Sequence, residues 1–151
     1  MRVLIQRVSN ASVVSDGVLT GEINEGLLIF AGFEDEDNDS DLEYAIRKIV
    51  NLRIFDDENG VMNLSVSDIS GEILLISQFT LHAQTKKGNR PSYIKAARPE
   101  KAIPLYEKFK SLLTASTSKE VKSGVFGADM KVSLLNNGPV TIWIDTKEIN
   151  Y

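Results

Sequence analysis

One stretch of the sequence joins an apolar strand to polar and cationic groups, and chemistry could occur there. SQFTL at 77–81 ends an apolar run that begins at Ile73, and Lys86, Lys87 and Arg90 follow closely. Strand ends that only turn the chain are rich in Gly, Asn and Asp instead. Hydroxyl and amide groups beside cationic side chains therefore predict a site for an anionic ligand.

The hydroxyl groups of Ser77 and Thr80 are candidate nucleophiles, but each needs a base to activate it. The only histidine of the chain is His82, and on an extended strand it would point to the same face as Thr80. The sequence offers no third group to orient the imidazole, and a lone histidine near a strand end is more typical of a surface or hydrogen-bonded residue. A nucleophile supplied by the protein is therefore a weakly supported hypothesis.

Metal catalysis has even less support in the sequence. With one His, no Cys and no H-x-x-x-H spacing, only carboxylates remain as ligands. The acidic run at 34–43 holds seven acids, but it lacks the glycine and glutamate spacing of a helix-flanked calcium loop. We expect a solvated acidic loop there, and no metal or cofactor in the protein.

Charges are distributed unevenly along the chain. The net charge of −4 weakly opposes binding to nucleic acid, yet the segment 86–101 holds six bases and one acid. Such a segment can bind phosphate locally while the acidic run lies elsewhere. Taken alone, a charge cluster is more typical of a solvated loop, so the phosphate interpretation depends on other residues.

Length and composition are those of one ordinary domain. The 151 residues suffice for one substantial core, with 42% hydrophobic and 25% charged residues. The first residues do not resemble a signal peptide, and no apolar run approaches the ~20 residues that span a membrane. Because there is also no cysteine for disulfides, we expect a soluble intracellular protein.

Periodicity and turn residues predict a mainly antiparallel β-sheet with two covering helices. The expected strands cover 3–14, 18–23, 27–33, 52–55, 73–81, 130–135 and 140–145, the first three as an antiparallel meander. Ser40 and Glu43 match a capping box at the start of one helix, and Pro104 is expected in the first turn of the other. The prediction is a single α+β domain over residues 1–151.

A second unusual stretch, NNGPVT at 136–141, joins the last two predicted strands. Gly-Pro between strands is usually a turn with a trans bond, since only about 5–6% of X–Pro bonds in folded proteins are cis. A tip without a side chain at Gly138 exposes its backbone carbonyls. Such a tip can act as a stiff backbone probe in a pocket.

Together, SQFTL at 77–81 and GPVT at 138–141 closely resemble the D-aminoacyl-tRNA deacylase family. The resemblance covers essentially the whole chain, including RVLIQRVSNASV at 2–13, NLRIFDDENGVMNLSV at 51–66, KGNRPSY at 87–93 and FGADMKVSLLNNGPVT at 126–141. It implies cytoplasmic homodimers, with a barrel-like sheet in the dimer, that hydrolyse the ester between a D-amino acid and the 3′ end of tRNA. It further implies removal of glycine misattached to alanine tRNA.

The resemblance also assigns the chirality filter to particular residues. In this family the Gly-Pro bond is cis, reaches into the site of the partner subunit and rejects L-amino acids, which places Gly138 and Pro139 in that role. Arg7 falls where the family has an arginine that helps to hold the orientation of the motif. Asn137 occupies a place where family members often have Asp, and this difference changes little.

The same resemblance answers why a strand should end in polar and then cationic residues. The strand end forms the polar floor of the pocket around the ester, with Ser77, Gln78, Phe79 and Thr80. The cationic side chains hold the phosphates of the attached tRNA, with Lys86, Lys87 and Arg90. In this family the 2′-hydroxyl of the terminal adenosine assists the water, so the protein mainly positions the substrate and supplies backbone dipoles. Thr80 as a nucleophile ranks below this route.

Two alternatives remain open. One is a related editing domain, such as that attached to archaeal threonyl-tRNA synthetases, which removes L-serine. The intact SQFTL and GPVT motifs and the free-standing chain argue against it. The other is a non-enzymatic RNA-binding protein that uses the same basic segment. Loss of ester from D- and L-tyrosyl-tRNA would separate all three.

Overall fold

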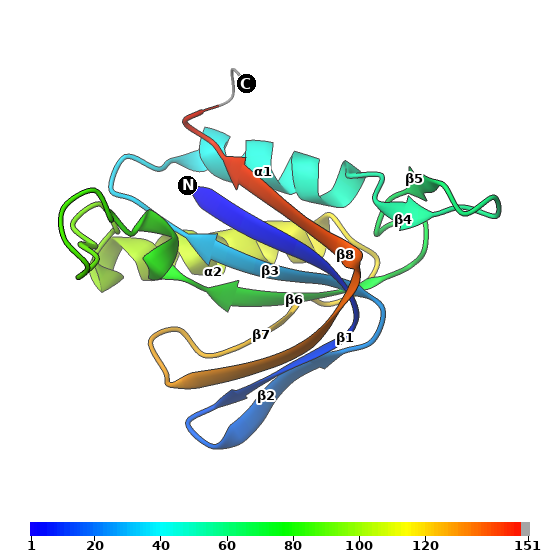
Figure 1. Ribbon diagram of the computed structural model, residues 1–151, viewed down its shortest axis with the longest axis horizontal. Helices are drawn as coiled ribbons and strands as arrows, with labels where there is room; N and C mark the ends of the chain where they lie inside the picture. The colour runs from blue at the N-terminus through cyan, green and yellow to red at the C-terminus, as the bar shows by residue number, and fades with distance from the viewer. Residues whose placement is uncertain (149–151) are drawn as a thin grey trace.

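Strand β1 (Arg2–Ser15) is central to the fold, which a computed structural model describes for residues 1–148 (Figure 1). Along one edge, its first half pairs with β3 (Gly26–Gly32) and its second half with β2 (Val18–Ile23), both antiparallel. The predicted meander is therefore wrong in its pairing, because β3 follows β2 in the chain but lies beside β1. A strand of 14 residues is long enough to serve both neighbours.

The other edge of β1 pairs with β8 (Met130–Asp145), and β6 (Glu72–Ser77) and β7 (Lys122–Ser123) extend the sheet beyond β3. All three pairings of β1 are antiparallel, whereas β3–β6 and β6–β7 are parallel because a helical connection separates each pair in the chain. The sheet curls until β2 approaches β7, so that it is nearly closed as a barrel (Figure 1). The predicted single-domain α+β class is confirmed.

Two helices, α1 (Asp39–Asn51) and α2 (Pro99–Ala115), cover one face of the sheet (Figure 1). Their apolar side chains pack with alternate residues of β1, β3 and β6 into the main core. The intervening residues of β3 and β6 pack in a smaller core on the opposite face, as the alternation of side chains along a strand requires, and β1 contributes Val8, Ala11 and Val13 to this core. Within residues 1–148, no helix is both long and apolar enough to cross a membrane.

Both predicted helices begin at other residues than expected. Asn38 caps α1: its side chain accepts a hydrogen bond from the Ser40 amide, and the Asp41 carboxylate accepts one from the Asn38 amide. An Asn and an Asp at this spacing satisfy free amides of the first turn in the way that the predicted box at Ser40 would have done, two residues earlier in the chain. Pro99 begins α2, so Pro104 lies inside the helix rather than in its first turn.

Four predicted strands also differ from the structure. The strand expected at 73–81 ends at Ser77, and Phe79–His82 forms a short 3₁₀ helix, η1. The two strands expected at 130–135 and 140–145 are parts of the continuous β8. Because α1 continues through Asn51, the short strand expected at 52–55 is displaced to β4 (Phe55–Asp56), which pairs with β5 (Met62–Leu64).

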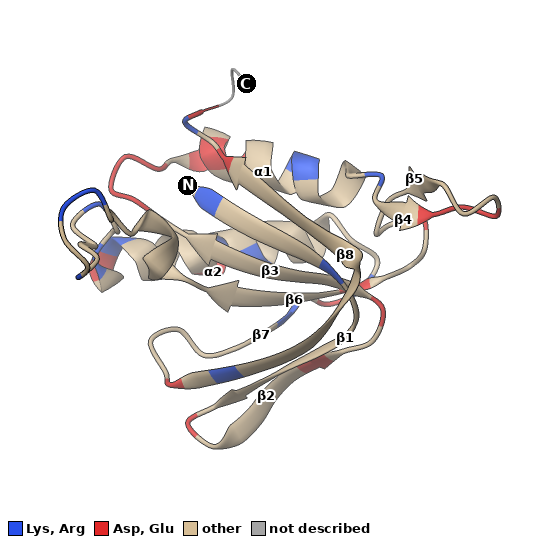
Figure 2. Ribbon diagram, viewed as in Figure 1, with Lys and Arg blue, Asp and Glu red and all other residues tan. Residues whose placement is uncertain are grey.

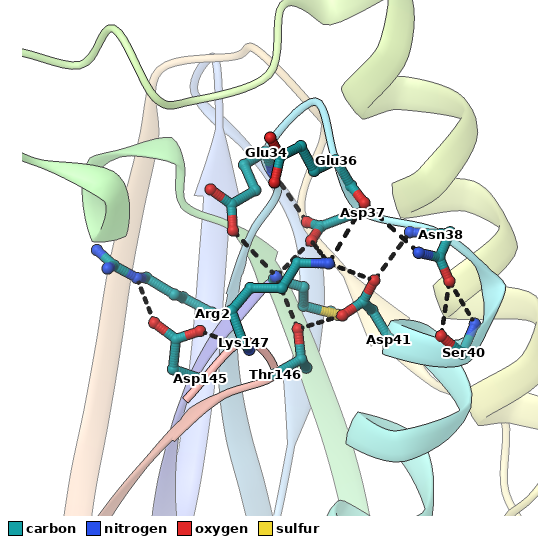
Figure 3. Close-up of polar contacts among 11 residues, drawn as sticks. Arg2, Glu34, Glu36, Asp37, Asn38, Ser40, Asp41, Asp145, Thr146 and Lys147 are labelled. Atoms are coloured by element: carbon teal, nitrogen blue, oxygen red, sulfur yellow. Dashed lines mark hydrogen bonds and ion pairs between the residues drawn. The ribbon is translucent and has the colours of Figure 1, made fainter. Parts of the chain in front are cut away.

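A polar cluster at the amino terminus links the start of β1, the start of α1 and the end of β8 (Figure 3). The buried α-ammonium group of Met1 donates hydrogen bonds to Asp37 Oδ1 at 2.5 Å and Thr146 Oγ1 at 2.9 Å. Thr146 donates to Asp41 Oδ1 at 2.6 Å, and Lys147 Nζ donates to Asp41 Oδ2 at 2.8 Å. The acidic run is therefore not a wholly solvated loop, because Asp37 and Asp41 are buried in this cluster.

The cluster makes the stability of the fold dependent on the ionisation of Asp41. Burial alone would raise the pKa of Asp41, but hydrogen bonds from Lys147, Thr146 and the Asn38 amide outweigh it and lower the pKa below the ordinary value of 3.8. A carboxyl group with a lowered pKa in the folded state stabilises the fold above its unfolded pKa. This stabilisation is lost as the pH falls through the folded pKa.

We predict that Asp41→Asn lowers the free energy of unfolding at pH 7 by about 1–3 kcal/mol, because it weakens charge-assisted hydrogen bonds. The variant should also lose less stability than the wild type below about pH 4, because the amide cannot titrate. Urea unfolding of both proteins between pH 3 and 7 measures this difference. Asp39→Asn is the control, since the exposed Asp39–Lys108 pair contributes little. Parallel pH profiles for the wild type and Asp41→Asn would contradict the assignment.

Candidate active site

A pocket of about 290 Å³ opens at the carboxyl ends of β3 and β6. It lies between these strand ends, the beginning of α2 and the turn that leads from β7 into β8. The side chains around it are mainly small or apolar, with polar groups supplied by the end of β6. Its lining includes Gly32, Phe33, Ser77, Gln78, Phe79, Phe126, Met130 and Val132.

The polar side of the pocket forms where β6 ends and η1 begins. Ser77 is the last residue of β6 and pairs with Ala31, and the Gln78 amide donates to the Ala31 carbonyl at 2.8 Å. The chain then turns, and Gln78 Nε2 donates to Thr80 Oγ1 at 2.5 Å. A Cβ on Gly32 would lie 2.7 Å from the Gln78 carbonyl oxygen, so the close approach of the two segments needs glycine there.

Ser77, Gln78 and Phe79, which the sequence analysis proposed for the site, line this pocket, whereas Thr80 contacts it only through Gln78. Sequence reasoning assigned no role to Phe126 and Met130, which also line the pocket. Their segment was part of the family resemblance, but its apolar residues carry no chemical signal. Only the curl of the sheet brings this segment to the pocket.

His82 does not form the pair with Thr80 that an extended strand would allow. In η1 the two residues no longer share one face, and His82 is buried with 1% of its surface exposed. Neither ring nitrogen has a hydrogen-bond partner among residues 1–148. Burial lowers the pKa of His82 below its ordinary value of 6.5, which favours the neutral imidazole. The Thr80 hydroxyl therefore has no neighbouring imidazole to activate it.

The Gly138–Pro139 bond is cis and lies in an outward bulge of β8. Gln6 pairs with Thr141 and Val8 with Asn136, so the single residue Arg7 faces the four residues 137–140. These residues cannot continue the regular ladder, and β8 bulges there. The predicted tip is thus present, but within one strand rather than between two.

Arg7 holds this bulge from the neighbouring strand. Its Nε donates to the Asn137 carbonyl at 3.1 Å, and its Nη1 donates to the Ile54 carbonyl at 2.6 Å. Asp56 lies 3.3 Å from the same nitrogen. Gly138 has a φ of +117°, and a Cβ there would lie 2.7 Å from Arg7 Nη2. The position of the guanidinium group therefore favours glycine at 138, as does the positive φ.

Asn136 fixes the bulge from its other side. Its Nδ2 donates to the Arg7 carbonyl at 3.0 Å and to the Val140 carbonyl at 3.0 Å. The amide thus bridges β1 and the two ends of the bulge, replacing hydrogen bonds that a regular ladder would make. Sequence reasoning did not assign a role to Asn136. An Asn before Asn-Gly-Pro would only have suggested a turn.

Within one chain, the pocket and the Gly138–Pro139 bulge are separate. Arg7, which contacts the bulge, pairs with Leu27 at the start of β3, whereas Ser77 pairs with Ala31 near its end. Four residues of strand separate these positions by about 13 Å along β3 alone. The structure of a single chain therefore does not bring the two predicted halves of the site together.

The predicted phosphate-binding residues lie on the pocket side. Lys86, Lys87 and Arg90 are exposed on the loop between η1 and α2, where Figure 2 shows a concentration of basic residues. Hydrogen bonds between Gln84 and Ser92, of 2.8 and 3.0 Å, close the base of the loop. Among residues 1–148, none of the three cations forms an ion pair, so all three can face a polyanion.

These features describe a small α+β protein with a pocket at strand ends, a basic loop beside it and a braced backbone bulge. The family model of D-Tyr-tRNA(Tyr) deacylase matches residues 4–145, and the chain belongs to this family. The resemblance seen in the sequence is confirmed, and with it the class of enzyme, a D-aminoacyl-tRNA deacylase that hydrolyses an ester.

Individual relatives are similar in sequence over nearly the whole chain. A D-aminoacyl-tRNA deacylase of Bacteroides fragilis (strain YCH46) is 64% identical, with 97% of this chain and 98% of that protein covered. The protein of the same name from Flavobacterium psychrophilum is 62% identical, with the same coverage. Among solved structures, the c-Myc DNA unwinding element binding protein matches with a TM-score of 0.91 and 40% identity, covering 96% of this chain and 98% of that one.

A more distant structure, that of a probable eukaryotic D-amino acid tRNA deacylase, shares the fold. Its TM-score is 0.79 at 18% identity, with 95% of this chain and 97% of that chain covered.

We predict that Arg7→Lys reduces ester hydrolysis at least tenfold while the protein stays folded. Lysine keeps the charge near Asp56, but a single ammonium group cannot donate to the Asn137 and Ile54 carbonyls in the two directions that guanidinium provides. The melting temperature and the hydrolysis of D-tyrosyl-tRNA measure the two effects. Asp56→Asn is the control, because this half-exposed carboxylate contributes little through its ion pair. Equal activities of Arg7→Lys and Asp56→Asn would contradict the role of the guanidinium contacts.

Proposed function

We propose that the protein binds the 3′ end of D-aminoacyl-tRNA in the Ser77–Phe79 pocket and hydrolyses the ester there. The observation that carries this proposal is that the basic loop leaves and rejoins the pocket lining, since Phe79 before the loop and Ala97 after it both line the pocket. An ester in the pocket would place the phosphates of its RNA next to Lys86, Lys87 and Arg90. The proposed compartment is the cytoplasm, where charged tRNA is used.

Rejection of L-amino acids is assigned to the Gly138–Pro139 bulge. A general editor of D-amino acids cannot grip one side chain, but it can obstruct the position that every L side chain would occupy. Arg7 and Asn136 hold the bulge from two sides, which suits it to act as a fixed obstacle. Glycine has no side chain to meet the obstacle, so glycyl-tRNA, including glycine misattached to alanine tRNA, is a proposed substrate.

The obstacle is proposed to come from a second subunit. Within one chain the bulge and the pocket lie apart along β3. A homodimer can bring the bulge of one chain to the pocket of the other by two-fold symmetry. Exposed apolar side chains on β8 offer a surface for such pairing: Leu134, Leu135 and Trp143.

Catalysis is assigned to the RNA and the protein backbone together. The pocket brings no base to the Thr80 hydroxyl, since the imidazole of His82 is buried outside the pocket lining and does not share a face of η1 with Thr80. The first amide groups of a helix have no partner within it, so the start of η1 can supply backbone donors to the ester carbonyl. We assign activation of the attacking water to the 2′-hydroxyl of the terminal adenosine.

The experiment that tests the proposed function compares three substrates. Purified protein should release amino acid from D-tyrosyl-tRNA and glycyl-tRNA, and leave L-tyrosyl-tRNA intact. Ester loss is followed as acid-precipitable radioactivity, with buffer alone as the control for spontaneous hydrolysis. Binding without hydrolysis of any substrate would indicate an RNA-binding protein. Hydrolysis of L-tyrosyl-tRNA would contradict the role of the bulge as an obstacle to L side chains.

A further prediction distinguishes catalysis by the RNA 2′-hydroxyl from catalysis by Thr80. Thr80→Ala should keep at least about a tenth of the wild-type rate of hydrolysis, because the lost group only accepts a hydrogen bond from Gln78. D-tyrosyl-tRNA with a 2′-deoxy terminal adenosine should lose most of its reactivity and still bind. Single-turnover rates and filter binding measure the two properties. The opposite pair of results would support Thr80 as the nucleophile: Thr80→Ala would be inactive, and the wild type would still hydrolyse the deoxy substrate.

Another prediction tests whether the pocket of one chain and the bulge of the other form one site. Gln78→Ala alters the pocket, and Gly138→Ala alters the bulge, so each homodimer should be inactive. Coexpressed chains should form mixed dimers in which one pocket and one bulge are both intact, restoring about a quarter of the wild-type activity in a random mixture. Two affinity tags allow the mixed dimer to be purified. If it is as inactive as its parents, the site lies within one chain.

A further inference from the structure

Two exposed aromatic rings stand between the pocket and the basic loop. Phe79 is 56% exposed and Tyr93 is 38% exposed. Their ring centroids lie 5.1 Å apart at an interplanar angle of 77°, an edge-to-face contact. Adjacent exposed aromatic side chains mark an interaction surface more often than isolated ones do.

Both rings are held in place by the backbone that carries them. Phe79 belongs to η1 and also lines the pocket. Tyr93 directly follows Ser92, whose hydrogen bonds to Gln84 close the basic loop. On its other side, the Ala96 amide donates to the Tyr93 carbonyl at 2.9 Å. Tyr93 is thus anchored at the base of the loop rather than at its tip.

An edge-to-face pair leaves at least one face of each ring uncovered by the other ring. Flat aromatic faces beside clustered cations are the combination that single-stranded nucleic acid binds, through base stacking and phosphate contacts respectively. Here the cations are the six basic residues between 86 and 101, against a single acid. The charge therefore favours an RNA strand over an acidic or apolar protein as the occupant.

We propose that Tyr93, supported by Phe79, stacks on the base of the nucleotide that precedes the terminal adenosine of the tRNA. This inference rests on the proposed function, which places the ester near Ser77 and Gln78. The strand then leaves the pocket past Phe79 and reaches the cations of the loop beyond Tyr93. A stacked base on this path directs the single-stranded end into the pocket, independently of its sequence and of the amino acid that it carries.

The test compares two substrates in four proteins: the wild type, Tyr93→Phe, Tyr93→Leu and Ile94→Ala. One substrate is D-tyrosyl-tRNA, and the other is 3′-D-tyrosyl-adenosine, which has no preceding nucleotide. Tyr93→Leu should raise the KM for D-tyrosyl-tRNA about tenfold, the usual effect of losing one stacked base. Its kcat, and its KM for tyrosyl-adenosine, should stay unchanged. Tyr93→Phe should behave as the wild type, since it keeps the ring.

Ile94→Ala is the matched control, because Ile94 is 83% exposed beside Tyr93 and cannot stack. An equal rise in KM for Ile94→Ala and Tyr93→Leu, or equal losses on both substrates, would overturn the stacking role. So would unchanged kinetics of Tyr93→Leu on tRNA. If instead Tyr93→Leu changes the oligomeric state in light scattering, the rings serve a protein contact, and the proposal is also overturned. Failure of the proposed function is distinct, since the wild type would then hydrolyse neither substrate.

A 2-aminopurine base placed before the terminal adenosine gives an independent readout. Its fluorescence should be quenched on binding to the wild type and to Tyr93→Phe, because stacking on an aromatic ring quenches it. With Tyr93→Leu, at protein concentrations that saturate binding, the quenching should be lost. Equal quenching by all three proteins would contradict the proposal.

Discussion

The pairing of β8 with β1 positions part of the pocket lining, the Gly138–Pro139 bulge and the amino-terminal cluster. It begins at Met130, which lines the pocket, and ends at Asp145, next to the amino-terminal cluster. In a regular antiparallel ladder over this length, residues 137–140 would stay in the sheet, paired with β1. The ladder is interrupted opposite Arg7, and only there can residues 137–140 leave the sheet. The β1–β8 pair thus provides both a long regular ladder and the bulge that interrupts it.

Each half of the site depends on a glycine that allows two segments to approach closely. Gly32 leaves room for the Gln78 carbonyl where β6 turns into η1, and Gly138 leaves room for the guanidinium group of Arg7. Side chains with obvious catalytic chemistry are few, and the imidazole of His82 is buried away from reaction. These two glycines place backbone groups rather than reactive side chains at the pocket and at the bulge, as the proposed mechanism requires, in which the substrate supplies the hydroxyl group.

The sequence predicted the class of fold and the main strands and helices, because these follow from local periodicity and turn residues. It did not predict that β3 pairs with β1, since pairing depends on which edge of a long strand remains free. The continuous β8 was missed for a related reason. Asn-Gly-Pro favours a turn locally, but Arg7 and Asn136, which bridge the bulge to β1, keep both halves of the strand in one sheet. The residues around 136–141 alone do not indicate such hydrogen bonds to a distant strand.

The polar strand end and the basic loop could be proposed as parts of a site because unusual residues stand together in the chain, as in Ser77 to Arg90, and the structure places Ser77, Gln78 and Phe79 at a pocket. Phe126 and Met130 could not be found in this way, because apolar residues look alike in a core and in a pocket wall. The same limit applies to the exposed pair of Phe79 and Tyr93, which are 14 positions apart and meet only because η1 replaces the end of the predicted strand. Had the strand continued to Leu81, alternation would have carried Phe79 along the sheet, away from the base of the loop. The 3₁₀ helix η1 therefore joins the pocket to the surface that we propose to face the RNA.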